Sequence, residues 1–167
     1  ASPPANPVVR DRAPGGALPS VEPRPESRDC AIQLHDVSST TGITFTHHDG
    51  SSGLRYIVEA MSTGIATFDY DGDGLIDIYF PNGAPLPGCE PAEVPRHALY
   101  RNLGDWKFQD VTQQAGLVCT AYGMGVTVGD FDDDGYQDIY LSNFGPNFLY
   151  RNNGDGTFTD VTKEAGV

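Results

Sequence analysis

The stretch FDYDGDGLIDIYF, residues 68–80, places aspartates at alternate positions and then runs into a strand-like segment. A second stretch, GDFDDDGYQDIYL at residues 129–141, repeats the same pattern. Like charges this close together repel each other, so loops of this kind favour a bound cation. Two copies in one chain indicate a repeated structural unit.

The spacing of the acids suits a calcium ion. In a curled loop, alternate side chains point inward, so several carboxylates converge on one point. A backbone carbonyl at the seventh position adds a further oxygen, and Ca²⁺ takes about six to eight oxygen ligands. Gly74 and Gly135 stand where each loop must turn sharply. The predicted ligands of the two Ca²⁺ sites are Asp69, Asp71, Asp73, Leu75 and Asp77, and Asp130, Asp132, Asp134, Tyr136 and Asp138.

These loops differ from EF-hands. An EF-hand closes with a glutamate at its twelfth position, where this chain has Phe80 and Leu141. The loops also join strand-like segments and not helices. Asp133 is expected to be an additional solvated acid or to contact the ion through a water molecule.

An internal repeat organises the chain. LYRNLGDWKFQDVTQQAGL (99–117) matches LYRNNGDGTFTDVTKEAGV (149–167), and HDVSSTTGI (35–43) is a partial third copy of QDVTQQAGL. Each full repeat predicts four short strands, and four-stranded repeats of this length are typical of β-propeller blades. The predicted strands are 64–70, 76–80, 97–102 and 107–112, then 123–131, 137–142, 147–153 and 157–162, with a further strand at 43–48. QQAG and KEAG each predict one helical turn.

The predicted fold is therefore all-β, an incomplete propeller unless other copies or a longer chain complete it. Its expected regions are a Pro-rich extended arm (1–29), a partial leading repeat (30–63), a first repeat (64–117) and a second repeat (118–167). The arm is expected to be a linker or a segment that docks on a neighbouring subunit.

The charge balance limits the partners. The formal net charge of −13 argues against nucleic acid and anionic lipid and favours cations. The sequence contains no apolar run near the length of a membrane helix. ASPPANP at the start fits the mature end of a secreted protein.

The chain resembles the FG-GAP/VCBS repeat family. The resemblance is carried by the motif D-x-D-x-D-G-x-x-D between two strands, followed by LYRNNGDGTFTDVT. The resemblance covers about residues 33–167 and is closest to a secreted bacterial branch of cartilage-acidic-protein-like proteins. Gly83-Ala84-Pro85 and Phe144-Gly145 match part of the family's name motif. The resemblance implies extracellular, calcium-stabilised propeller blades, as in the integrin α-subunit head, that bind or adhere without catalysis.

Two blades leave apolar faces and strand edges exposed. Either the polypeptide is longer, or copies complete one another head to tail as a ring or filament. The arm and strand 43–48 are candidates for reaching the next copy. The alternatives to a structural or adhesive role are a carbohydrate- or protein-binding head and the non-catalytic module of an extracellular enzyme.

Several single residues carry weaker expectations. Propeller topology puts Cys89 and Cys119 on the same face, which favours a disulfide between them and leaves Cys30 free or intermolecular. His47 and His48 point to opposite sides of a strand and cannot easily share an ion, and His35 and His97 are expected at the surface. Trp106 is expected to be exposed and is the candidate contact for a glycan or partner. Tyr79, Tyr100, Tyr140 and Tyr150 are expected to pack between blades. Nothing resembling a G-x-S-x-G nucleophile elbow is present.

Overall fold

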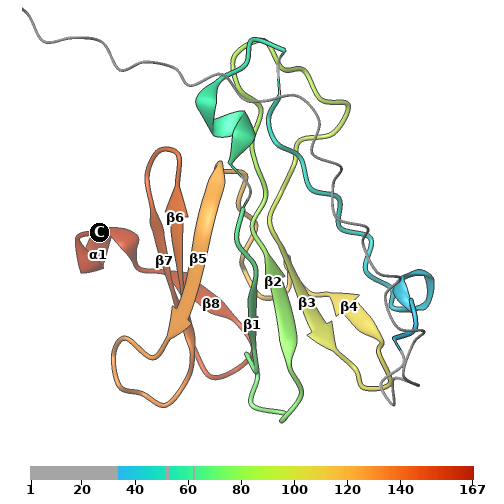
Figure 1. Ribbon diagram of the computed structural model, residues 1–167. Coiled ribbons are helices and arrows are strands. Elements are labelled where there is room, and N and C mark those ends of the chain that lie inside the picture. Colours follow the sequence, from blue (N-terminus) through green and yellow to red (C-terminus); the bar gives the residue numbers. More distant parts are fainter. Residues whose placement is uncertain (1–33, 52, 62) are drawn as a thin grey trace, which may run out of the picture. The chain divides into compact units, whose positions relative to one another are not determined.

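A computed structural model of the chain describes residues 34–51, 53–61 and 63–167 (Figure 1). Asp36–Val167 form one compact unit. The expected Pro-rich arm and Cys30 lie outside the described residues. None of the helices in the described part has the length and apolar character of a membrane span.

The compact unit contains two four-stranded antiparallel sheets, each in simple sequence order. All eight strands predicted for the two repeats are present, mostly with shorter bounds, and the all-β, blade-like fold is confirmed. The first sheet, the first blade, consists of β1 (Ala66–Phe68), β2 (Asp77–Phe80), β3 (Ala98–Asn102) and β4 (Phe108–Asp110). The second sheet, the second blade, consists of β5 (Gly123–Gly129), β6 (Asp138–Asn143), β7 (Phe148–Asn152) and β8 (Phe158–Asp160).

Among the described residues, helix is confined to three short segments. They are the 3-10 helices η1 (Ser38–Thr40) and η2 (Ile57–Ala60), and α1 (Thr162–Ala165). The predicted turn at KEAG coincides with α1. QQAG also forms a single turn, in which the Ala115 amide donates to the Val111 carbonyl at 2.8 Å.

The blades stack front to back. Side chains alternate between the two faces of a sheet along each strand. Because the two sheets are copies of one repeat, each face of the first sheet has a corresponding face in the second. The front face carries Ile78, Phe80, Tyr100 and Phe108 in the first blade and Ile139, Leu141, Tyr150 and Phe158 in the second. The back face carries Tyr79, Leu99 and Val111 in the first blade and Tyr140, Leu149 and Val161 in the second.

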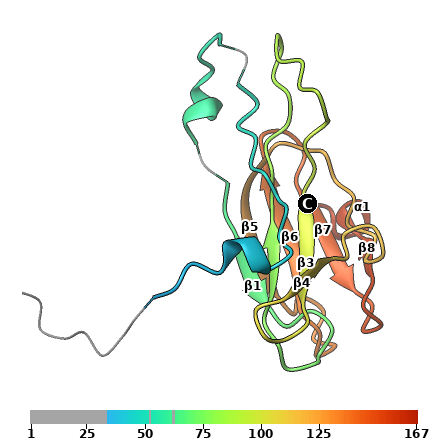
Figure 2. The same ribbon diagram turned by 90° about the vertical axis from the view of Figure 1, so that its right-hand side faces the viewer.

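The core lies between the back of the first blade and the front of the second. Tyr79, Leu99, Ile139 and Leu141 are completely buried there. Figure 2 views the two sheets with the first blade toward the viewer. The expected packing role is confirmed for Tyr79 and Tyr150, whereas Tyr140 lies on the open back face and is only half-buried.

The predicted strand at 43–48 is wrong. This segment crosses the front face of the first blade and does not pair along an edge. The Thr44 amide donates to the Tyr100 hydroxyl at 3.1 Å, and the Phe45 ring stacks on Phe80 at 4.7 Å between centroids. The segment contacts side chains of β3 and β2 across the face of the sheet. It therefore does not lie beside an edge strand, where it could form backbone hydrogen bonds as a further strand.

The surface position expected for His97 is also wrong, because its side chain is fully buried. Its Nδ1 lies 3.1 Å from the Tyr79 hydroxyl and its Nε2 lies 3.0 Å from the Ala121 carbonyl. Cys89 and Cys119 are free thiols, so the expected disulfide is not formed in this structure.

Candidate metal centres

The two aspartate-rich loops join β1 to β2 and β5 to β6, at the same lower end of the sheets in Figure 1. Each loop follows the end of one strand and leads into the next strand of the same sheet. The sheet therefore fixes the positions of the first and last aspartates of the loop. Gly74 and Gly135 have φ of 86° and 94°, a conformation that glycine adopts without the steric cost of a side chain.

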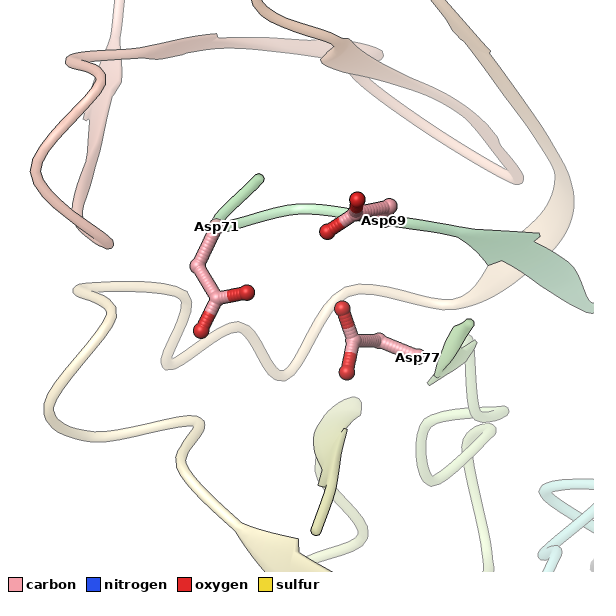
Figure 3. Close-up of side chains that lie close together, drawn as sticks. All are labelled: Asp69, Asp71 and Asp77. Carbon is pink, nitrogen blue, oxygen red and sulfur yellow. The ribbon is translucent and has the colours of Figure 1, made fainter. Parts of the chain in front are cut away.

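Three carboxylates converge in the first loop. Asp69, Asp71 and Asp77 each place one carboxylate oxygen within 4.8 Å of the others. Figure 3 shows these side chains pointing into a common space, two from the loop and one from the start of β2. In the second loop, Asp130, Asp132 and Asp138 form the same group.

The first aspartate of each loop organises the backbone. Asp69 accepts hydrogen bonds from the amides of Gly72, Asp73 and Gly74 at 2.9, 3.1 and 2.8 Å. Asp130 accepts the equivalent bonds from Asp134 and Gly135 at 3.0 and 2.8 Å. Charged acceptors form strong bonds of this kind, so the sequence of the loop itself imposes the curled shape.

The last aspartate of each loop is buried in the sheet. Asp77 accepts from the amides of Tyr70 at 3.0 Å and Asn102 at 2.7 Å, and burial raises its pKa to about 6. Asp138 accepts from the amides of Phe131 at 2.9 Å and Asn152 at 2.7 Å. Each of these carboxylates therefore connects its loop to the third strand of its own blade.

Hydrogen bonds also connect the two centres. The Asn152 side chain donates to the Tyr70 carbonyl at 2.8 Å, and the amide of Tyr70 donates to Asp77. Since the amide of Asn152 donates to Asp138, a continuous path runs from one carboxylate group to the other across the blade interface.

The remaining predicted ligands lie outside the two groups. Asp73 and Asp134 instead accept from the amides of Leu75 and Tyr136, both at 2.9 Å. The hydrogen bond from Leu75 and the neighbouring arginine lower the pKa of Asp73. The carbonyls of Leu75 and Tyr136 stay predicted ligands.

Arg101 distinguishes the two centres, and the sequence did not reveal its role. Its Nε lies 2.7 Å from Asp71 Oδ2, and its Nη2 lies 3.0 Å from Asp73 Oδ2. Arg151 is the equivalent residue, but it forms no ion pair within the described part of the chain. Consistent with this, desolvation and the neighbouring carboxylates, Asp134 first, raise the pKa of Asp132.

The first group fits a calcium ion. The Oδ1 atom of Asp71 is buried and has no hydrogen-bond partner among the described residues, although Oδ2 of the same side chain meets Arg101. A buried carboxylate oxygen without a partner is costly unless a cation is bound. Together with the carboxylates of Asp69 and Asp77, that of Asp71 offers the hard oxygen ligands that Ca²⁺ prefers.

Comparison with protein families agrees with the repeat. Residues 95–141 and residues 130–166 match the family model of the FG-GAP-like repeat. This chain carries FG-GAP-like repeats. Such repeats form β-propeller-type modules that are typically extracellular and non-catalytic, and they often bind calcium. A search of curated proteins gives no match to the chain.

Trp106 is exposed, as expected, and lines a cleft of about 470 Å³ on the front of the first FG-GAP-like blade, together with Ile78 and Phe108. In the second blade, Tyr70 of the first blade occupies the equivalent region, where its ring stacks on Phe158 at 6.2 Å between centroids. The cleft therefore corresponds to an interface between blades, and we assign it no separate ligand.

Proposed function

We propose that this chain is a secreted, calcium-binding FG-GAP-like module with a structural or adhesive role, and that it belongs to an assembly of more than two blades. The observation that supports it most strongly is the same three-carboxylate group built twice, with equivalent backbone hydrogen bonds to its first and last aspartates. Coincidental acidic turns would not reproduce both the group and its supporting bonds.

Calcium would stabilise the lower end of each blade. In the first loop it would be held by Asp69, Asp71 and Asp77, and in the second by Asp130, Asp132 and Asp138. The bound ion offsets the repulsion between the carboxylates. Since Asp77 also accepts the Asn102 amide, the ion would hold the loop, β2 and β3 as one unit.

An extracellular location suits this chemistry. Calcium sites of extracellular modules commonly bind with dissociation constants of about 10⁻⁴–10⁻³ M, so they are filled outside cells and empty in cytosol. The acidic chain, with its formal net charge of −13, also favours a calcium-rich environment over nucleic acid or anionic membranes.

Isothermal titration of the full chain with calcium tests the proposal. We expect two binding events, of which Asp71→Asn weakens one and Asp132→Asn weakens the other. A folded wild-type chain that takes up no calcium at millimolar concentrations would refute the assignment of both centres.

A further inference from the structure

A cleft of about 370 Å³ lies on the first blade, at the end opposite its aspartate loop (Figure 1). Segments far apart in the chain line it: residues 44–46 and His48 from the segment that crosses the front face, residues 93–96 from the β2–β3 connection, and Ala98, Tyr100 and Asp110 from β3 and β4. We call residues 43–48 the crossing segment. The volume lies within the range of about 300–1,000 Å³ that is usual for small-molecule sites.

The first repeat differs from the second at two of the places that line this cleft. Residues 81–97 connect β2 to β3, whereas the equivalent connection between β6 and β7 is only residues 144–147. Ala98 corresponds to Phe148, whose ring stacks on Tyr150 at 5.8 Å between centroids. A methyl group therefore stands in the first blade where a phenyl ring packs in the second, so the cleft depends on residues that are particular to the first repeat.

Asn82 holds the two sides of the cleft together and is almost completely buried, at 3% exposure. Its Oδ1 accepts the His48 amide at 2.7 Å. Its Nδ2 donates to the carbonyls of Thr46 and Arg96 at 3.1 and 3.2 Å. These bonds fix the crossing segment against both ends of the β2–β3 connection. The cleft is therefore formed before any ligand arrives, as small-molecule sites usually are.

The cleft has hydrogen-bonding groups that the described residues leave without partners. Nδ1 of His48 accepts the Gly50 amide at 2.8 Å, so the ring proton is on Nε2, which meets no acceptor in this part of the chain. No hydrogen bond or ion pair from a described residue reaches the Glu93 carboxylate. Arg96 and Asp110 form an ion pair of 2.7 Å, but their side chains remain 49% and 29% exposed. The guanidinium keeps N–H groups to donate, and the carboxylate keeps lone pairs to accept.

These groups suit an uncharged ligand with several hydroxyl groups. A hydroxyl donates one hydrogen bond and accepts others, so it pairs with a donor and an acceptor that lie side by side, as Arg96 and Asp110 do. Phe45 is partly exposed and adds aromatic surface, against which the C–H face of a sugar ring packs well. One arginine stands against two carboxylates in the lining, in a chain of formal net charge −13, which disfavours an anionic ligand.

We propose that this cleft binds a neutral saccharide. The Arg96–Asp110 pair and Nε2 of His48 bind its hydroxyl groups, and Phe45 contacts its ring. This binding function is additional to the calcium centres and lies at a different place from the cleft at Trp106. The crossing segment, which forms no strand, contributes two of the contacting side chains.

Binding of methyl glycosides to the full chain in calcium-containing buffer tests the inference. The probes are the methyl glycosides of glucose, galactose, mannose and N-acetylglucosamine, with methyl glucuronide as the anionic comparison. Saturation-transfer NMR detects weak binding, and isothermal titration measures the affinity. At least one neutral glycoside should bind with a dissociation constant in the millimolar range, and methyl glucuronide should bind more weakly than methyl glucoside.

Three variants locate the binding site. His48→Asn keeps an acceptor for the Gly50 amide but removes the Nε2 donor, so it should weaken binding about fivefold, the size of one net hydrogen bond. The matched control, His47→Asn, changes an exposed histidine of the same segment that lies outside the lining, and it should leave the affinity unchanged. Ala98→Phe introduces the residue that the second repeat has at this position, and it should abolish binding because the ring fills the cleft.

Several results would overturn the inference. One is a folded wild-type chain that binds none of the neutral glycosides at high millimolar concentration. Another is an affinity that His48→Asn lowers no more than His47→Asn does, or binding that a folded Ala98→Phe variant retains. Loss of binding in Trp106→Ala would assign the sugar to the other cleft, and a preference for methyl glucuronide would contradict the neutral ligand. If Ala98→Phe does not fold, the comparison of the two histidine variants decides.

Discussion

Replacing Asp132 by asparagine should remove calcium from the second loop without disturbing its backbone. Asp132 belongs to the carboxylate group of this loop, and none of the loop's backbone hydrogen bonds ends on its side chain, since these end on Asp130, Asp134 and Asp138. The substitution therefore changes the charge of the site and keeps the fold.

The expected effect follows from ligand linkage. An ion that binds only the folded state stabilises it by about 2.7 kcal/mol when its free concentration is 100-fold above Kd. For the unit Asp36–Val167, unfolding entropy of about 2.1 cal/mol/K per residue converts this to about 10 °C in Tm per filled loop. Two loops give a calcium-dependent rise of about 20 °C, and Asp132→Asn should reduce it by at least half.

The assay is thermal unfolding followed by circular dichroism, with saturating calcium and with EDTA. The matched control is Asp133→Asn, which removes the same charge from the same loop but lies outside the carboxylate group. Asp133 has a φ of 62°, which asparagine tolerates well. Equal losses of the calcium-dependent rise in the two variants would show that overall charge, and not a metal centre, accounts for the stabilisation.

Three further predictions concern the ion pair, a buried histidine and the core. Arg101→Met should raise the calcium affinity of the first loop, because it frees Asp71 from its ion pair. Arg151→Met should change the calcium affinity of the second loop little. Equal effects of the two substitutions in calorimetric titrations would contradict the ion-pair argument. Burial lowers the pKa of His97. The stability that the neutral side chain contributes to the folded state is therefore complete above the unfolded pKa of about 6.5 and is lost as pH falls through the lower folded pKa. The urea midpoint of the wild type should therefore fall more steeply than that of His97→Gln between pH 7 and pH 5. If the two midpoints fall in parallel with pH, the folded state does not depend on a neutral His97. Leu141→Ala should lower the unfolding free energy by about 3 kcal/mol, and exposed Leu103→Ala by less than about 0.5 kcal/mol; similar losses in urea unfolding would show that the front-to-back core is misplaced.

The sequence was sufficient to predict the blades and all three members of each carboxylate group, because both depend on local periodicity. Alternation places Tyr79 and Leu99 on one face, and the spacing of Asp69, Asp71 and Asp77 brings them together once the glycine turn is made. Asp73 fits the same alternation but binds the Leu75 amide and Arg101, since a nearby donor competes with the shared centre.

The errors concern contacts between segments far apart in the chain. His97 is buried because the connection at Ala121 covers it. The segment at 43–48 alternates like a strand, but it crosses β3 and β2 and lies at no sheet edge. A pattern of alternating residues does not distinguish these two placements, because a crossing segment can also turn alternate side chains, here Ile43 and Phe45, toward the sheet.

The hydrogen-bond path from Asp138 through Asn152 and Tyr70 to Asp77 makes the two loops mutually dependent. An ion that fixes Asp138 also fixes the strand end that positions Tyr70, whose amide holds the carboxylate of the other site. Calcium uptake is then expected to be cooperative, with the first ion paying part of the ordering entropy of the second. Under the proposed function, chelation would accordingly loosen the joint between the blades, and bound calcium would stiffen it.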